Sequence, residues 1–161
     1  MNVFTVKSQA LQYTVNKHSD STIVAFKAQL LHNGLNLSGS ADIVFDSVIF
    51  NNGNAYDNHT GCFIVPSAGF YEFHVQLVWF ATEKPKTVGF KIVKNKSSRE
   101  DVENWTEVSP TLNGGTFTQT SALMHLTVGD TIRVNAGAGS GGTTTIANYL
   151  GDSQFYGYKV Y

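Results

Sequence analysis

One stretch of the sequence, residues 69–80, constrains the fold most strongly. Every odd position from 71 to 79 holds an apolar side chain, and polar side chains fill positions 72, 74 and 76. Successive side chains of a β-strand point to opposite faces of its sheet, so this alternation predicts a long strand with one buried face. The apolar positions are Tyr71, Phe73, Val75, Leu77 and Trp79.

Seven further runs alternate in the same way. Turn-forming pairs such as Asn52-Gly53 and Gly129-Asp130 punctuate the chain between runs. Strands that recur every 8–12 residues or so, with no helical stretch between them, are typical of an all-β sandwich or barrel. Only residues 97–104 have a composition suited to a helical turn. The seven runs are residues 22–27, 43–50, 62–65, 88–93, 117–126, 131–135 and 154–161.

Length and composition narrow the class of protein. A chain of 161 residues corresponds to one domain. Charged residues make up 14%, against about 25% in an average soluble domain, and the formal net charge is -1. Without an excess of positive charge, we expect no nucleic-acid partner. The aromatic content of 12% argues against disorder, and a single cysteine excludes a disulfide framework.

The first twenty residues lack the apolar core of a secretory signal. No run in the chain approaches the roughly 18 apolar residues of a membrane span, so we expect no membrane insertion. We interpret residues 1–20 as a short N-terminal extension and residues 21–161 as one globular domain.

An ordered set of short motifs makes the fold assignment specific. The chain closely resembles the complement C1q globular-head family, part of the C1q/TNF-like superfamily, from about residue 21 to residue 161. The resemblance implies a ten-stranded jelly roll that assembles into a homotrimer. The motifs are Ala25-Phe26-Lys27-Ala28, Phe50-Asn51-Asn52-Gly53-Asn54-Ala55-Tyr56-Asp57, Gly69-Phe70-Tyr71-Glu72-Phe73, Ser121-Ala122-Leu123-Met124-His125-Leu126 and Phe155-Tyr156-Gly157-Tyr158.

The aromatic residues near the C-terminus agree with a trimer, because a chain packed against a threefold partner needs apolar area there. The alternative is that the same rings fill the core of one monomer. The expected interface or core residues are Tyr71, Phe73, Phe155, Tyr156 and Tyr158.

Two features of many family members are missing from the sequence. Residues 1–20 show no collagen-like repeat with glycine at every third position. Some members bind calcium with carboxylates in the loop that matches residues 111–116, which contain none here. Calcium needs six to eight oxygen ligands, usually including negative ones, so we expect neither calcium nor another metal or cofactor.

Catalytic motifs are weak. Residues 137–142 fit the pattern G-x-G-x-x-G, but the β-branched residues 143–146 follow where a nucleotide site needs a helix. No Gly-x-Ser-x-Gly elbow is present, and the five histidines form no ligand pattern. Carboxylates such as Asp57 and Asp130 fall mostly in turns, where aspartate forms local hydrogen bonds. We therefore expect a protein that is not an enzyme.

A histidine, the single cysteine and four asparagines can each be interpreted in two ways. His74 is expected to be a satisfied core or interface histidine, with a pH-sensitive trimer contact as the alternative. Cys62 is expected to be a buried free thiol, with an intersubunit disulfide as the alternative. Four tripeptides fit the N-glycosylation pattern, which favours secretion only weakly because chance supplies about two or three. They begin at Asn36, Asn58, Asn95 and Asn104.

Binding residues are expected on two loop-rich segments, residues 94–116 and 136–154. An aromatic ring stacks on the C–H face of a sugar, amides bond its hydroxyls, and arginine grips a carboxylate in two places. The alternative interpretation of Trp105 is a core residue, and the alternative interpretation of Arg133 is a charged residue at the interface. The candidate carbohydrate-binding residues are Arg99, Trp105, Asn113, Arg133, Asn148 and Tyr149.

The resemblance extends to function. Stand-alone heads of this kind in invertebrates resemble soluble lectins and pattern-recognition proteins of innate immunity, some of which bind sialic acid. A trimer presents three equal sites, so weak affinity at each becomes avidity on a glycan-covered surface. The sequence thus predicts a secreted, calcium-independent, trimeric carbohydrate-binding protein. The alternatives are a cytokine-like trimeric ligand for a protein receptor and a structural trimerisation module.

Overall fold

The computed structural model describes residues 23–31, 35–37, 39–80, 87–95, 101–109, 111, 113–138, 144–147 and 152–160. The expected N-terminal extension, residues 1–20, lies outside them. The described chain contains β-strands and no helix, which confirms the all-β prediction. Five of its thirteen strands have four residues or fewer, so the chain is divided more finely than the expected ten strands.

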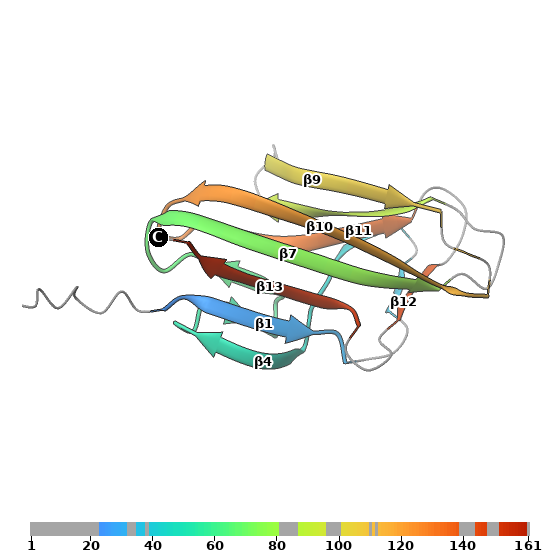
Figure 1. Cartoon of the computed structure of the whole chain (residues 1–161), viewed down its shortest axis with the longest axis horizontal. Coiled ribbons are helices and arrows are strands. Elements are labelled where there is room, and N and C mark those ends of the chain that lie inside the picture. Colours follow the sequence, from blue (N-terminus) through green and yellow to red (C-terminus); the bar gives the residue numbers. More distant parts are fainter. Residues whose placement is uncertain are drawn as a thin grey trace, which may run out of the picture.

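The strands form two antiparallel sheets, and β7 lies at the centre of the larger one, sheet A (Figure 1). Along one edge β7 pairs with β10 over its whole length, and along the other it pairs with β13 and β12. Sheet A consists of β1 (Ala25–Gln29), β2 (Leu35–Leu37), β4 (Ser47–Asn52), β7 (Gly69–Phe80), β10 (Gly115–Leu126), β12 (Thr144–Ala147) and β13 (Gln154–Lys159).

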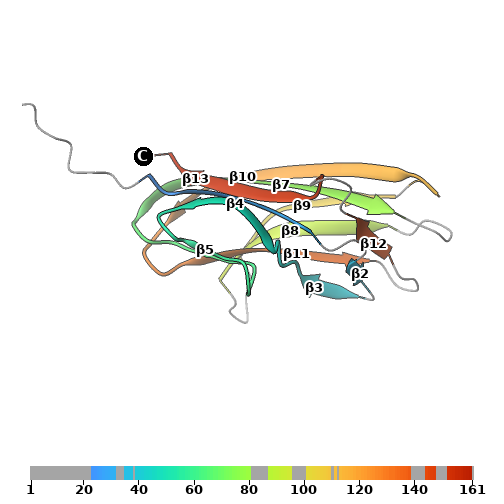
Figure 2. The ribbon, with the colours of Figure 1, turned by 90° about the horizontal axis from the view of Figure 1, so that it is seen from below.

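Sheet B packs beneath sheet A, as the edge-on view in Figure 2 shows. Its strands follow the order β5-β6-β11-β8-β9, and β3 also pairs with β11. The strands of sheet B are β3 (Ser40–Asp42), β5 (Tyr56–Asp57), β6 (Cys62–Ile64), β8 (Val88–Lys94), β9 (Asp101–Val108) and β11 (Thr131–Ala138).

The core between the sheets is aromatic. The odd positions 71–79 of β7 are each at most 1% exposed, which confirms the alternation seen in the sequence. The ring of Phe26 stacks on Tyr56 at a centroid distance of 4.7 Å and meets the edge of Phe155 at 4.9 Å. Aromatic pairs at this separation add to the free energy gained from burial alone.

Gly157 lets β13 approach β7 closely. A Cβ atom at this position would lie 2.5 Å from Cδ1 of Phe73 and 2.9 Å from the carbonyl oxygen of Glu72. No other residue type fits this position without displacing the Phe73 ring or the β7 backbone, which explains a glycine in the middle of a strand.

Two local predictions differ from the structure. Residues 101–104 belong to β9 rather than to a helical turn, because β9 pairs with β8 at the edge of sheet B. The run 43–50 is not a single strand. Ile43 donates its backbone N–H to the carbonyl of Val134 in sheet B, whereas β4 begins at Ser47 and pairs with β1 in sheet A. The alternating residues 43–46 therefore cross from one sheet to the other.

Candidate binding face

The outer face of sheet A carries three rows of side chains that cross its strands. Cross-strand partners in an antiparallel sheet share a face, so the register shows which side chains are neighbours. The first row is Ala25, Tyr158, Glu72 and Leu123; the second row is Phe50, Lys27, Tyr156, His74 and Ser121; the glutamine row is Gln29, Gln154, Gln76 and Gln119.

Glu72 joins the first two rows. One carboxylate oxygen lies 2.9 Å from Nε2 of His74, and the other accepts a hydrogen bond of 2.6 Å from the hydroxyl of Tyr158. The hydrogen bond to Glu72 raises the pKa of Tyr158, because it favours the protonated phenol.

Tyr156 lies between His74 and Lys27. The imidazole of His74 stacks on its ring with a centroid distance of 4.8 Å, and Nζ of Lys27 lies 5.9 Å from the ring centre. His74 is therefore partnered by Glu72 and Tyr156 within the monomer. This arrangement agrees with the expectation that His74 has its interactions satisfied within the protein.

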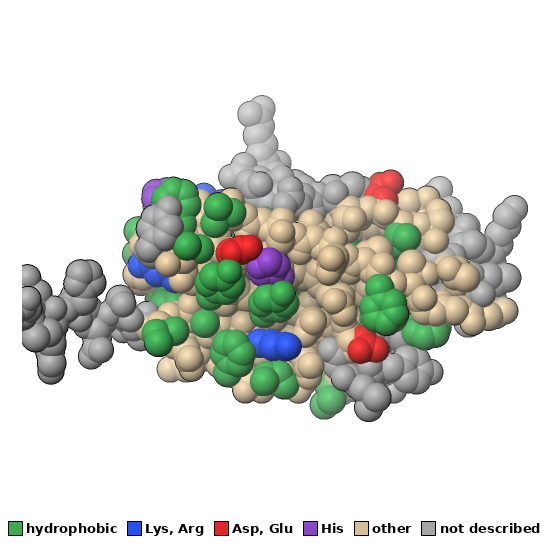
Figure 3. Space-filling model, in the orientation of Figure 1, with side chains coloured by type: hydrophobic (Ala, Val, Ile, Leu, Met, Phe, Trp, Pro, Cys, Tyr) green, Lys and Arg blue, Asp and Glu red, His purple; other side chains and the backbone are tan. Residues whose placement is uncertain are grey.

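The same face exposes large apolar side chains. Leu123 and Phe117 on β10 are 64% and 61% exposed, and Phe50 and Tyr158 are also exposed. Figure 3 shows hydrophobic side chains gathered over one half of this face, with charged groups among them and uncharged polar atoms across its middle. Large exposed apolar side chains gathered on one face of a small domain mark an interaction surface.

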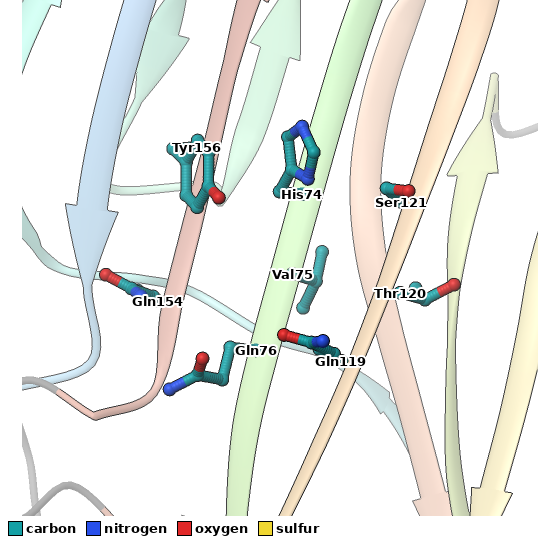
Figure 4. A pocket seen from close by; sticks show the side chains of 8 residues that line it. All are labelled: His74, Val75, Gln76, Gln119, Thr120, Ser121, Gln154 and Tyr156. Carbon is teal, nitrogen blue, oxygen red and sulfur yellow. The ribbon is translucent and has the colours of Figure 1, made fainter.

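A polar pocket lies in the middle of the face, beside the glutamine row. Its volume is about 250 Å³. Figure 4 shows the rings of His74 and Tyr156 at one end and three glutamine side chains at the other. The lining residues are His74, Val75, Gln76, Gln119, Thr120, Ser121, Gln154 and Tyr156.

The residues expected at the interface or in the core divide between the two faces of sheet A. Tyr71, Phe73 and Phe155 are fully buried between the sheets and belong to the core of the monomer. Tyr156 and Tyr158 project from β13 to the outer face, where Tyr158 is exposed. Three of the five residues are thus core residues of the monomer, and a trimer interface at Tyr156 and Tyr158 stays a prediction.

Only two of the six candidate carbohydrate-binding side chains, those of Asn113 and Arg133, belong to the described structure. Arg99, Asn148 and Tyr149 lie outside the described residues, and Trp105 lies on β9 with its side chain outside the description. Asn113 is exposed between β9 and β10, with a left-handed φ of 56°. In contrast to Asn113, Arg133 is only 3% exposed.

Arg133 is a structural ion-pair residue in this fold. Its Nε atom lies 3.2 Å from Oδ2 of Asp42 on β3, the strand that pairs with β11. The amide of Asn135 donates to the other oxygen of the same carboxylate at 2.8 Å. The expectation of a surface contact missed this burial because the sequence gives no sign that β3 pairs beside Arg133.

The turn carboxylates do form local hydrogen bonds, as expected. Asp57 accepts from the backbone N–H of His59 and the hydroxyl of Thr60. Asp130 accepts from the N–H of Thr127 and the amide of Asn95, and these hydrogen bonds hold its pKa well below the usual range. Among the residues that the structure describes, no three His, Cys, Asp or Glu side chains gather as a metal site.

The structure also describes Asn95 and Cys62, two side chains singled out in the sequence. The amide of Asn95, one of the four glycosylation candidates, donates to Asp130 and accepts from the N–H of Thr131 at 2.8 Å, so it is engaged within the fold. Cys62 forms no disulfide within the chain and is half-buried rather than buried, with Sγ 3.8 Å from the carbonyl of Thr60. The intersubunit disulfide stays an alternative prediction.

The three glutamines of the pocket were missed by sequence reasoning, which singled out only His74 and Tyr156 among its lining residues. Gln76, Gln119 and Gln154 each occupy the polar phase of an alternating run, which is the only signal that they face outward. Their convergence depends on the register between strands that are distant in the sequence, and alternation within one strand does not reveal it.

The described residues contain no helix long and apolar enough to cross a membrane. No curated protein matches the sequence. Solved structures do match, at 11–15% identity, and such low identity shows the fold alone. The Eiger TNF structure from S. frugiperda is 13% identical with a TM-score of 0.68, covering 87% of this chain and 94% of that one.

The globular domain of zebrafish complement 1qA is 15% identical with a TM-score of 0.66, covering 86% of this chain and 98% of that one. Murine APRIL at pH 5.0 is 13% identical with a TM-score of 0.66, covering 86% and 99% of the two chains. The model of the C1q domain family matches residues 25–160, nearly the whole described chain. The chain therefore belongs to the C1q domain family.

Proposed function

We propose that this C1q domain assembles as a homotrimer through the outer face of sheet A and acts outside the cell as a glycan-binding protein. The observation that carries the assembly is the exposed apolar area on that face, with Leu123 on its β10 edge. Burying a side chain of this size contributes about 1.5–3 kcal/mol. Domains of this superfamily typically self-associate as trimers, bind partners and are extracellular.

The glycan part of the proposal rests on the neutral polar character of the chain. A net charge of -1 with few charged residues leaves amides, hydroxyls and aromatic rings as the main binding groups. We propose Arg99, Trp105, Asn113, Asn148 and Tyr149 as sugar contacts, with Arg99 suited to the carboxylate of sialic acid. Arg133 is not among them, because its guanidinium is buried against Asp42.

Two measurements test the proposal. Mass determination in solution should give a trimer, and Leu123→Lys should shift it towards monomer, whereas Val128→Lys, an equally exposed site outside this face, should not. A glycan array probed with the purified protein should show binding that Trp105→Ala or Tyr149→Ala reduces. A protein that is monomeric at all concentrations would contradict the proposed trimer, and a glycan array without binding would contradict the proposed glycan ligand.

A second candidate function is a ligand for a protein receptor. Ile64 and Val128 are 49% and 68% exposed, and the hydrogen bond from the N–H of Gly129 to the carbonyl of Val65 holds their segments together. This apolar pair lies outside the outer face of sheet A, so it would stay exposed in the proposed trimer. Loss of binding to receptor-bearing cells on Ile64→Asp, with an unchanged glycan array, would favour this function.

A further inference from the structure

Four glutamines from four strands lie side by side in the glutamine row. Gln29 on β1 is opposite Gln154 on β13, which is opposite Gln76 on β7, which is in turn opposite Gln119 on β10. Each side chain amide offers two donors and an acceptor oxygen. The row therefore concentrates uncharged hydrogen-bonding groups on one part of the face.

The glutamine amides that line the pocket keep hydrogen-bonding groups that no other part of the described protein occupies. Nε2 of Gln76 donates to the carbonyl of Asp152 at 3.0 Å, which fixes that side chain and leaves its oxygen available. Within the described part of the chain, the side chain amides of Gln119 and Gln154 have no hydrogen-bond partner. The side chain of Gln119 is exposed and that of Gln154 is half-buried, so both amides are accessible to a ligand from solvent.

The pocket has the size and charge of a site for a small neutral molecule. Its volume of about 250 Å³ lies below the range of roughly 300–1,000 Å³ for drug-sized ligands. His74 is its only titratable lining group besides the phenol of Tyr156, and Glu72 lies 2.9 Å from that imidazole. None of the lining residues that the structure describes is a lysine or arginine able to hold a carboxylate or a phosphate.

We propose that this pocket binds the ring of one neutral monosaccharide. The amides of Gln119 and Gln154 and the oxygen of Gln76 would bond ring hydroxyls at one end (Figure 4). The rings of His74 and Tyr156 close the other end, where C–H groups of a sugar pack against aromatic side chains. This site is built on strands, whereas the sugar contacts proposed above lie mainly in loop-rich segments.

The inference rests on the proposed function in one respect, the covering of the pocket. If a second copy packs on the outer face of sheet A, the amides beside the pocket become enclosed. Enclosing amides without partners is unfavourable, and a bound sugar supplies the partners. Sugar binding and self-association therefore stabilise each other, by mass action on the assembled state.

The experiment uses the full chain with galactose, mannose, fucose and N-acetylglucosamine, and with N-acetylneuraminic acid as the charged sugar. Saturation-transfer NMR measures binding, and thermal unfolding measures stabilisation. We expect at least one neutral sugar to bind saturably and to raise Tm and the trimer fraction on dilution. Gln119→Met should weaken that sugar about tenfold, which equals one lost hydrogen bond of about 1.4 kcal/mol.

Gln29→Met is the matched control, because it removes an amide from the same row at a position that does not line the pocket. Circular dichroism checks that both variants fold. The inference is overturned if no neutral sugar saturates, if Gln119→Met binds as tightly as wild type, or if N-acetylneuraminic acid competes for the same site. Sugar binding lost on Trp105→Ala but kept in Gln119→Met supports the loop site and overturns this one. A monomeric protein that binds neutral sugar through Gln119 overturns the assembly and supports the pocket.

Discussion

The imidazole of His74 and the phenol ring of Tyr156 lie stacked across β7 and β13, with their planes 13° from parallel. This pair marks a boundary on the outer face of sheet A. The first row, with Tyr158 and Leu123, lies on one side, and the glutamine row lies on the other. One flat surface of this domain thus combines an apolar area suited to self-association with a polar hollow.

Gly157→Ala should destabilise the fold severely. The added methyl would meet the Phe73 ring and the Glu72 carbonyl in the centre of sheet A, and overpacking of this kind costs about 1–3 kcal/mol. Chemical denaturation measures the change in the free energy of unfolding. Gly114→Ala is the control, because a Cβ there meets Thr111 at an ordinary 3.5 Å. Equal stability of the two variants would contradict the close approach of β13 to β7.

Asp130→Ala should lower stability at neutral pH and reduce its dependence on acid. The Asp130 carboxylate accepts hydrogen bonds from Thr127 and Asn95 and lies 3.3 Å from Nζ of Lys94. Its pKa is lowered in the folded state, so its contribution is complete above the unfolded value of about 4 and is lost as pH falls below it.

We expect a loss of about 1–3 kcal/mol at pH 7, measured by denaturation, and convergence of the Asp130→Ala and wild-type curves in acid. Thr60→Ala, which removes a hydrogen bond to the exposed carboxylate of Asp57, is the control and should change stability little. Parallel curves down to pH 2 would show that the hydrogen bonds do not favour the charged carboxylate.

Arg133→Ala should lower Tm by several degrees and leave glycan binding unchanged. The substitution leaves the Asp42 carboxylate without its guanidinium partner, and Asp42 is partly exposed, so about 1–3 kcal/mol is expected rather than the full cost of a buried charge. Differential scanning fluorimetry and the glycan array give the two readouts. A folded variant that no longer binds sugar would return Arg133 to the binding residues.

Glu72→Gln should lower the pKa of the Tyr158 phenol towards its usual value of about 10. In the wild type, the hydrogen bond to the Glu72 carboxylate raises that pKa, so its contribution to stability is full below about pH 10 and is lost as pH rises through the raised value. Ultraviolet titration of phenolate, corrected with Tyr158→Phe, measures the shift. An identical Tyr158 titration in both proteins would show that the hydrogen bond is not formed in solution.

Much of the fold can be predicted from local pattern. The alternation of residues 69–80 fixes which side chains of β7 are buried, and it predicts the fully buried Trp79 as well as the outward His74. Alternation reports burial rather than pairing, however. Phe45 is buried in a segment that crosses between the sheets, and β9 escaped notice because the acidic residues Asp101 and Glu103 occupy an edge strand.

The candidate site depends on long-range register and is less accessible from the sequence. Gln76, Gln119 and Gln154 meet only because β10 and β13 both pair with β7 in one particular alignment. A shift of either strand by one residue would turn its glutamine towards the core. Arg133 shows the opposite case, since this charged side chain on an alternating strand is buried and ion-paired with Asp42, a residue distant in the sequence.

The position of β13 has a consequence for folding during synthesis. Strand β13 lies between β7 and β1, so nearly the first and nearly the last described residues are neighbours in the middle of sheet A. During synthesis on the ribosome, β1 can pair with β4, but its other edge stays without β13 until residues 154–159 have emerged. Because exposed strand edges invite wrong pairing, we expect a chain truncated before residue 154 to aggregate, since the inner edges of β1 and β7 would lack the strand that joins them.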